Sequence, residues 1–226
     1  MKRVLLCFGL IFSSISQAND SSGIWLFNAL QTDFGGSNYL AFLEIQPRSK
    51  NDNKDFSQLI IRPFLGYKVT KKLQLWLGFA WQGEYDDINK FDLATKDIIE
   101  QVQWINDIAK NLNFQYRFRL EQRFFENADL SHRMRHRFRL QYTIPDTQFY
   151  LVAFNELFVY FNSLNSSRLE HSVQAGVNQN RSYTGVGYKV TPNLNVDLGY
   201  QFQFVNNFGT NDLYNHVWLT NVNFTF

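Results

Sequence analysis

Apolar and polar residues alternate with a period of two along most of this chain. The alternation is clearest between Leu194 and Phe204, where every even position is apolar or aromatic and most odd positions carry an amide or a carboxylate. Successive side chains of a β-strand point to opposite faces of the sheet. Such a segment therefore predicts a strand with one apolar face and one polar face.

The stretch Asn111–Tyr142 predicts two such strands with a short connection between them. Its apolar face carries leucine, methionine and aromatic residues, and its polar face carries a ladder of arginines: Arg117, Arg119, Arg123, Arg133, Arg135, Arg137 and Arg139. In a soluble sandwich the arginines would meet water. In a membrane barrel the apolar face meets lipid and the arginines line the lumen.

Eight further segments alternate in the same way, namely Ile24–Leu30, Tyr39–Pro47, Phe56–Val69, Leu73–Tyr85, Ile98–Ile108, Gln148–Asn162, Gln179–Val190 and Asn215–Phe226. Many of them have about the length that a tilted membrane strand needs. The total is eleven runs, whereas a barrel with both ends in the periplasm needs an even number. We therefore expect an all-β, antiparallel transmembrane β-barrel of about twelve strands in an up-and-down meander. Ten strands are the alternative, if Ile24–Pro47 is one interrupted strand.

The connections between these segments also alternate in length. Thr70–Lys72, Ala109–Asn111, Pro145–Asp146 and Thr191–Asn193 have the composition of tight turns. Longer polar loops are predicted at Asp86–Asp97, Asn127–Ser131, Ser163–Asn178 and Asn206–Tyr214. Short turns on one rim and long loops on the other are typical of outer-membrane barrels, in which the short turns are periplasmic.

Aromatic residues make up 17% of the chain, with 23 Phe and 11 Tyr. After Ala18 no run of eighteen apolar residues exists, so no transmembrane helix is expected. A barrel places many aromatic side chains on its outer face and in interfacial girdles. The last strand alternates up to an aromatic residue, Phe226, as outer-membrane barrels commonly do. The expected partners are therefore outer-membrane lipid and the barrel assembly machinery, which reads such an ending.

The first eighteen residues have the pattern of a secretory signal peptide. Lys2 and Arg3 precede the apolar segment Val4–Ile15, and Ser16-Gln17-Ala18 is a small-x-small cleavage site. We expect residues 1–18 to be the signal and residues 19–226 to be the barrel, located in the cell outer membrane. Cleavage removes the single cysteine, Cys7, and lowers the basic residues from 22 to 20, equal to the 20 acidic ones. Net charge therefore gives no reason to expect nucleic acid as a partner.

Several strings in this chain occur together in an order that is familiar. They are Gln58-Leu59-Ile60-Ile61-Arg62-Pro63, Arg119-Leu120-Glu121-Gln122-Arg123-Phe124, Arg137-Phe138-Arg139-Leu140, Asn155-Glu156-Leu157-Phe158, and Gln179-Asn180-Arg181 followed by Gly185-Val186-Gly187-Tyr188. In this order they resemble the domain of unknown function 2490 family, short Gram-negative outer-membrane barrels. That family often has an aspartate where this chain has Asn178. The resemblance covers nearly all of the mature chain and implies fold and location, but no reaction.

Parity assigns charged side chains to the inward face. The cations are Arg48, Arg62, Lys68, Arg117, Arg119, Arg123, Arg133, Arg135, Arg137, Arg139, Arg181 and Lys189, and the anions are Glu44, Glu84, Asp107, Glu121, Glu156 and Asp197. All of the cations except Arg48, Lys68 and Lys189 are candidates for lumen or anion-binding residues, together with Glu121 and Glu156. One interpretation is a plug of paired charges that braces the barrel. The other is a small pore or slot that prefers anions, because an arginine lining selects them.

The alternative function is an outer-membrane hydrolase, phospholipase-like or protease-like, acting at the outer rim. Phospholipase barrels use a His-x-Ser pair, whereas here His171 is followed directly by Ser172. Asp86, Asp87, Asp212 and His216 are expected near one rim, as a protease-like site would require. His132 and His136 are four residues apart on a strand, over ~13 Å, too far to share a metal ion. We expect no catalytic residues, no metal and no cofactor.

Overall fold

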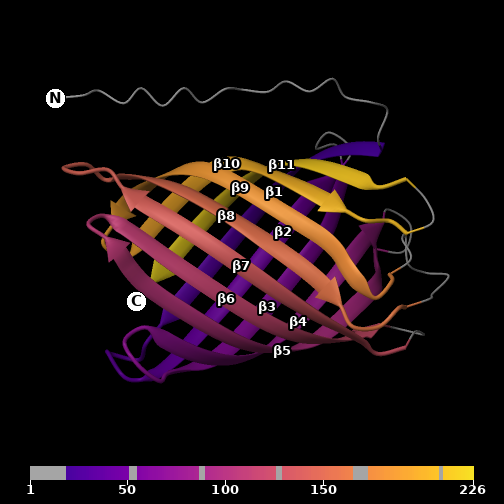
Figure 1. Ribbon diagram of the computed structural model, residues 1–226, viewed down its shortest axis with the longest axis horizontal. Helices are drawn as coiled ribbons and strands as arrows, with labels where there is room; N and C mark the ends of the chain where they lie inside the picture. The colour runs from indigo at the N-terminus through magenta and orange to yellow at the C-terminus, as the bar shows by residue number, and fades with distance from the viewer. Residues whose placement is uncertain (1–18, 51–54, 87–89, 126–128, 165–172, 209–210) are drawn as a thin grey trace.

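The computed structural model describes residues 19–50, 55–86, 90–125, 129–164, 173–208 and 211–226. These residues form eleven β-strands: β1 (Asn19–Thr32), β2 (Tyr39–Lys50), β3 (Asp55–Lys68), β4 (Leu73–Asp86), β5 (Lys90–Ala109), β6 (Leu112–Phe125), β7 (Ser131–Thr143), β8 (Phe149–Tyr160), β9 (Gly176–Thr191), β10 (Leu194–Val205) and β11 (Leu213–Thr225). Each strand pairs with the next one along the chain, and β1 pairs with β11 to close a barrel (Figure 1). The predicted all-β meander is confirmed.

The number of strands differs from the expectation. The described residues form eleven strands, neither twelve nor ten, because β1 and β2 are separate strands and β1 pairs directly with β11. The even count assumes that both ends of the chain lie at one rim. Instead β1 and β11 are parallel, with Asn19 beside Leu213 and Gln31 beside Thr225. The two ends of the barrel sheet therefore lie at opposite rims, as Figure 1 shows.

The two rims carry different connections. At one of them, here called the turn rim, lie residues 33–38, 69–72, 110–111, 144–148 and 192–193 and the end of β11. Asn111 and Asp146 have positive φ there, 65° and 58°, as turn residues of this type tolerate. At the other rim, the loop rim, lie the start of β1 and the strand ends that the remaining connections join.

The predicted loop Asp86–Asp97 is wrong, since β5 begins at Lys90 and pairs with β4 through Ala94 and Gly83. The sequence there is polar and shows little alternation. The strand is continued by its backbone pairing and by Phe91, whose ring lies 5.4 Å from those of Trp81 and Tyr85. Backbone hydrogen bonds do not depend on side-chain alternation, so a polar stretch can extend a strand that has already begun.

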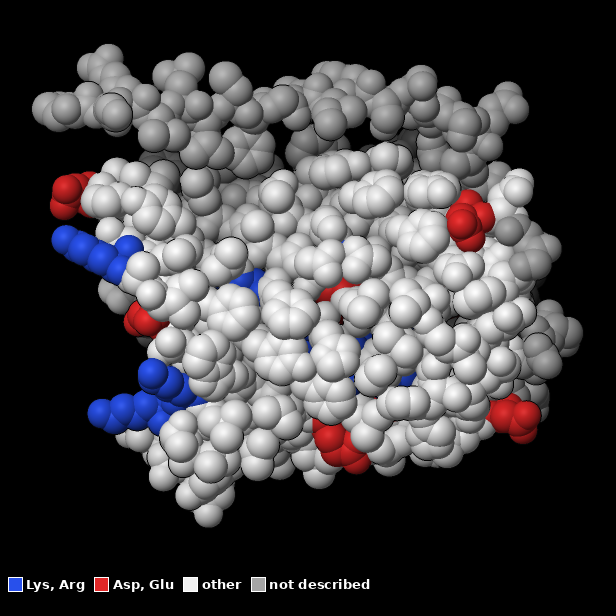
Figure 2. Space-filling model, viewed as in Figure 1, with Lys and Arg blue, Asp and Glu red and all other residues white. Residues whose placement is uncertain are grey.

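The outer surface of the barrel is largely apolar. Leu65, Leu77 and Trp218 are 70%, 60% and 57% exposed, and many other aliphatic and aromatic side chains share this surface. On the face drawn in Figure 2 most of the visible charge lies toward the two ends. Glu100 is an exposed exception, and its carboxylate accepts hydrogen bonds from Gln122 at 3.0 Å. Among the described residues no helix is both long and apolar enough to span a membrane.

The interior contains two apolar clusters. One joins β1, β8, β9 and β11 through Trp25, Tyr150, Val152, Tyr183, Val217 and Leu219. The other joins β2 to β5 through Leu40, Phe64, Trp76, Ala80 and Ile99. Phe27 packs against the first cluster and Phe42 against the second, and both are only partly buried.

Glycines beside the inward rings let them lie flat against the wall. Gly187 pairs with Tyr150, and a Cβ added to that glycine would lie 2.0 Å from the tyrosine ring. Gly78 pairs with Phe64, where the same distance is 2.1 Å. Any larger residue at these positions would push the ring toward the barrel axis, so these glycines preserve space inside.

The parallel closure predicts a specific cross-link. Leu30 and Phe224 are directly opposite in the β1–β11 register, and both side chains are exposed. In a chain that starts at residue 19, which has no other cysteine, Leu30→Cys with Phe224→Cys should form a disulfide on oxidation. The product should migrate faster in a denaturing gel until it is reduced.

The control combines Leu30→Cys with Val222→Cys instead of Phe224→Cys. Val222 is on the same face of β11 but lies two residues away from the partner of Leu30. It should oxidise more slowly, because partners shifted by two residues exceed the usual Cβ separation of a disulfide. Absence of a cross-link between positions 30 and 224 in the folded double variant would contradict the eleven-strand closure.

Candidate functional site

The arginine ladder forms a hairpin in which like charges are directly opposite. Arg117 on β6 is opposite Arg137 on β7, and Arg119 is opposite Arg135. Like charges at opposite positions of a strand pair destabilise it. Each arrangement therefore depends on carboxylates or amides that come from other positions and other strands.

Two glutamates supply most of this compensation. Glu121 on β6 accepts from Arg133 at 2.6 Å and from Arg135 at 2.8 Å, and Glu156 on β8 accepts from Arg135 at 2.9 Å and from Arg117 at 2.6 Å. Glu121 is fully buried and Glu156 is 3% exposed. Arg135 therefore lies between two carboxylates, and each carboxylate lies between two arginines.

This alternation continues toward the loop rim through a tyrosine. Tyr160 accepts hydrogen bonds from Arg133 at 3.0 Å and from Arg123 at 2.8 Å, and Arg123 pairs with Asp97 at 3.3 Å. We call the whole series the charged chain; it runs Asp97, Arg123, Tyr160, Arg133, Glu121, Arg135, Glu156, Arg117. All of its members are buried, so it fills the interior beside β5 to β8.

A second group of charges crosses the barrel. Glu44 on β2 pairs with Arg62 on β3 and lies 3.8 Å from Arg119 on β6. Arg119 also donates to Gln101 on β5 at 2.5 Å, and its guanidinium lies 4.9 Å from the ring of Phe64. The interior is thus narrow enough for side chains from distant strands to meet.

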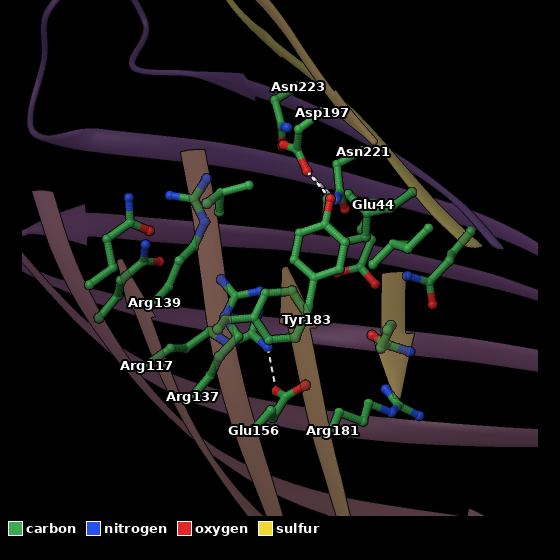
Figure 3. Close-up of a pocket in the computed structure, with 18 of the residues that line it drawn as sticks. Glu44, Arg117, Arg137, Arg139, Glu156, Arg181, Tyr183, Asp197, Asn221 and Asn223 are labelled. Atoms are coloured by element: carbon green, nitrogen blue, oxygen red, sulfur yellow. Dashed lines mark hydrogen bonds and ion pairs between the residues drawn. The ribbon is translucent and has the colours of Figure 1, made fainter. Parts of the chain in front are cut away.

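A cavity of about 290 Å³ remains inside the barrel. Eight arginines and three carboxylates line it, which is a formal excess of five positive charges: Arg48, Arg62, Arg117, Arg119, Arg135, Arg137, Arg139, Arg181, Glu44, Glu156 and Asp197. Figure 3 shows Arg117, Arg137 and Arg139 together on one side, with Asp197, Asn221 and Asn223 grouped on another.

Four of the lining arginines have no carboxylate within 4.0 Å among the described residues: Arg48, Arg137, Arg139 and Arg181. The guanidiniums of Arg48 and Arg181 lie 3.8 and 5.1 Å from the ring of Trp25. Arg137 lies 5.6 Å from the ring of Phe154, and Arg139 donates to Gln141 at 2.9 Å. These contacts hold the arginines in place and leave their positive charge uncompensated by an ion pair.

The carboxylate of Asp197 is held by neutral donors. Tyr183 and Asn221 each donate to it at 2.6 Å, and Tyr150 donates at 3.1 Å. Asp197 is 3% exposed and has no ion pair with an arginine or lysine in the described part of the chain. Its carboxylate is thus held within the wall by neutral donors and forms no ion pair within 4.0 Å with Arg137 or Arg139 in the described structure.

The cavity extends from the middle of the barrel toward the turn rim, and its lining also reaches Arg48 near the loop-rim end of β2. Its lining includes amides close to the turn-rim ends of four strands, Gln31, Gln141, Asn195 and Asn223. It does not include Asp97, Arg123, Tyr160, Arg133 or Glu121, which occupy the interior nearer the loop rim. Among the described residues, the charged chain thus borders the cavity through Arg117, Arg135 and Glu156, and its other members lie outside the lining.

The structure places all of the candidate residues inside the barrel. Arg117, Arg119, Arg135, Arg137, Arg139, Arg181, Arg62 and Glu156 line the cavity, and Arg123, Arg133 and Glu121 belong only to the charged chain. Of the remaining inward predictions, Arg48, Glu44 and Asp197 also line the cavity, and Lys68 lies near the turn rim. Lys68 bonds Asp33 at 2.8 Å, and this hydrogen bond lowers the pKa of Asp33 in the turn between β1 and β2. Asp107 and Glu84 are exposed near the ends of β5 and β4, which differs from the enclosed position expected of them.

Sequence reasoning missed the aromatic part of the lining. Trp25, Phe27, Phe42, Tyr150 and Tyr183 all face the cavity. The parity that assigns Glu156 inward assigns Tyr150 inward as well, and Arg181 likewise indicates Tyr183. The signal is present in the sequence, but a general preference of aromatic residues for the outer face of a barrel conceals it.

The residues considered for hydrolysis do not assemble into a site in the described structure. His216 bonds Tyr200, and His136 bonds Tyr116 at 2.8 Å. Asp212 accepts a backbone hydrogen bond from Asn207 at 3.1 Å. His171, Ser172 and Asp87 lie outside the described residues. Among the residues described, no group of three His, Cys, Asp or Glu side chains is arranged to hold a metal ion.

Comparison with known proteins agrees with the fold. Residues 22–214 match the family described as "Protein of unknown function (DUF2490)". An uncharacterized protein of Methylorubrum extorquens is 26% identical over 183 residues, which cover 78% of this chain and 75% of that protein. The solved structure of the NanC porin aligns with a TM-score of 0.52 at 12% identity and covers 90% of this chain and 99% of that one. At this identity the likeness concerns the fold alone.

Removal of the charge on Glu121 should destabilise the barrel. Glu121→Gln leaves Arg133 and Arg135 without one of their carboxylates in a fully buried place. Breaking a buried ion pair in this way costs about 3–5 kcal/mol. We expect a loss of that size in the free energy of unfolding, measured by denaturant titration in detergent.

The matched control is Glu100→Gln, on the neighbouring strand β5. Its carboxylate is exposed and bonded to Gln122. The change there should stay within about 0.5 kcal/mol. Equal stabilities of the two variants would contradict the role of Glu121 in the charged chain.

Proposed function

Because this chain belongs to the DUF2490 family, for which no function is known, we propose a function from the barrel interior: an exported outer-membrane barrel that binds small anions and passes them weakly. The observation that carries the proposal is the excess of eight arginines over three carboxylates around the cavity, four of these arginines being without an ion pair in the described structure.

The location is supported by the distribution of side chains. Leu65, Leu77 and Trp218 are well exposed on the outside, while Arg119 and Glu121 are buried inside. This is the reverse of a soluble protein and is typical of a barrel in lipid. The porin-like fold and the signal-like pattern of residues 1–18 favour the same location, with cleavage after Ala18.

The orientation follows from the rims. In outer-membrane barrels the short turns and the carboxyl-terminal end of the last strand are periplasmic. The turn rim and Phe226 would then face the periplasm, where the assembly machinery would read the last strand. The amides of the cavity lining would then lie toward the periplasm, and Asp97, Arg123 and Tyr160 of the charged chain would lie nearer the extracellular side.

Anion preference follows from electrostatics in a confined space. Arginines that lack a carboxylate raise the local potential in a narrow interior, which favours anions and excludes cations. The conductance should be small, because the buried side chains of the charged chain fill the interior beside β5 to β8. The charged chain also favours a second role, in which paired charges brace the barrel wall.

The location has a direct test. Expressed in a Gram-negative host, the chain should appear in the outer-membrane fraction and change its gel mobility on heating. Removal of Phe226 should reduce the assembled amount several-fold, whereas Phe34→Ser, in a turn, should not. A product found only in the soluble periplasm would reject the membrane assignment.

The anion preference can be measured in planar bilayers. Across a potassium chloride gradient, the wild-type barrel should give a small conductance. Its reversal potential should be shifted toward the equilibrium potential of chloride. The double variant Arg137→Gln with Arg139→Gln should shift this potential toward zero, because it removes two cavity charges that have no ion pair in the described structure.

The control is Lys71→Gln with Lys72→Gln, which removes two exposed charges from the turn between β3 and β4 at the same rim. Its reversal potential should match that of the wild type. A cation-selective or unselective wild-type barrel would reject the proposal.

A further inference from the structure

The cavity is chemically two-sided. Strands β6 and β7 contribute Arg117, Arg137 and Arg139 to it, whereas β1 and β2 contribute Phe27 and Phe42. In the closed barrel β7 is five strand steps from β1 in one direction and five from β2 in the other. The cationic wall and these two aromatic residues therefore lie on opposite sides of the interior.

The aromatic side is extended by its neighbours. The ring of Phe42 lies 6.2 Å from that of Trp76 on β4, and Trp25 on β1 also lines the cavity. Phe27 and Phe42 are only partly buried, so part of each ring borders the cavity. A chloride or phosphate ion would gain nothing from such a surface, whereas a flat carbon skeleton would bury apolar area and stack against it.

The lining also has an excess of hydrogen-bond donors. Four cavity residues carry a buried donor that has no acceptor in the described part of the chain: Arg62 Nε, Trp76 Nε1, Arg117 Nε and Gln201 Nε2. Among the described lining residues one buried acceptor, Glu44 Oε2, lacks a hydrogen bond, and it lies 3.8 Å from Arg119. These atoms are enclosed in the wall and add to its donor character, whereas the arginines that border the open space would bind the oxygens of a ligand.

The size of the cavity limits the ligand. At ~30 Å³ for each water molecule, 290 Å³ holds about ten waters or an organic molecule of similar bulk. The ring of amides at the turn rim gives polar access without an opposing charge. The charged chain borders the cavity through Arg117, Arg135 and Glu156, so the side lined by amides is the route by which we expect a ligand to enter.

From these observations we propose that the cavity binds a small organic anion with a flat apolar body, such as an aromatic carboxylate. The carboxylate would lie at Arg137 and Arg139, and the body would lie against Phe27 and Phe42. This inference rests on the proposed anion preference and adds the class of anion. Asp197, held by two tyrosines and Asn221, excludes the carboxylate from the β8–β10 side and so orients the ligand.

Benzoate, acetate and benzamide separate the two requirements. Benzoate has the ring and the charge, acetate has the charge without the ring, and benzamide has the ring without the charge. Titrated calorimetrically into the purified barrel in detergent, benzoate should bind at least tenfold more tightly than either of the others. In single-barrel recordings benzoate should reduce the chloride current from one side of the bilayer only.

Variants test which residues bind the carboxylate of benzoate and which bind its ring. Arg137→Gln should weaken benzoate binding at least tenfold, while Lys72→Gln, an exposed charge at the same rim, should leave it unchanged. Phe42→Leu should weaken benzoate binding several-fold and leave acetate binding as it is. Its matched control, Phe79→Leu, replaces an aromatic residue on the outer surface and should change neither.

The outcomes distinguish this inference from the function on which it rests. A barrel that prefers chloride in the reversal-potential measurement, but binds acetate as tightly as benzoate, would overturn the inference and keep the proposed function. A barrel without anion preference would overturn both. The comparison of the three probes on the wild-type protein needs no variant, so a misfolded variant would not obscure it.

Discussion

The fold depends on how buried arginines are neutralised in a narrow closed barrel. The β6–β7 register sets Arg117 opposite Arg137 and Arg119 opposite Arg135, an arrangement that repels itself across the hairpin. Glu121 and Glu156 resolve part of this repulsion by bridging pairs of arginines. Neither the carboxylates nor the arginines are solvated in this interior, so the loss of either would leave a buried charge uncompensated. The positions of β6, β7 and β8 relative to one another are therefore fixed by charge as well as by backbone hydrogen bonds.

The arginines of the charged chain and the other arginines around the cavity differ in their supply of carboxylates. Near the loop rim each arginine of the charged chain finds a carboxylate or a tyrosine oxygen, and the side chains fill the space. Nearer the turn rim, Glu156 bonds Arg117 and Arg135, and it forms no ion pair within 4.0 Å with Arg137, its partner in the described β7–β8 register. Arg137 and Arg139 are left with a ring and an amide as neighbours. Around the cavity eight arginines face three carboxylates, so its surplus charge comes from arginines that lack an ion pair in the described structure.

Much of the fold could be predicted from alternation, and the site only in part. Parity places Arg62, Arg119 and Glu156 inside correctly, because a strand side chain has only two directions. Parity carries no information on distance across the barrel, so the approach of Glu44 to Arg119 and the stacking of Arg48 and Arg181 on Trp25 could not be foreseen. The strand count fails for a different reason. It assumes that both ends lie at one rim, whereas the parallel β1–β11 pair satisfies the backbone hydrogen bonds equally well.

The aromatic lining also explains how arginines without an ion pair in the described structure are held in place around the cavity. Guanidinium groups are weakly hydrated and pack against aromatic faces. Trp25 and Phe154 accept this contact from Arg48, Arg181 and Arg137, which positions the arginines without consuming their charge. A carboxylate in place of each ring would hold the arginines as firmly but would cancel the field. Rings fix the positions of the arginines but, unlike carboxylates, do not cancel their charge. A site that binds anions reversibly needs cations that are both fixed and unpaired.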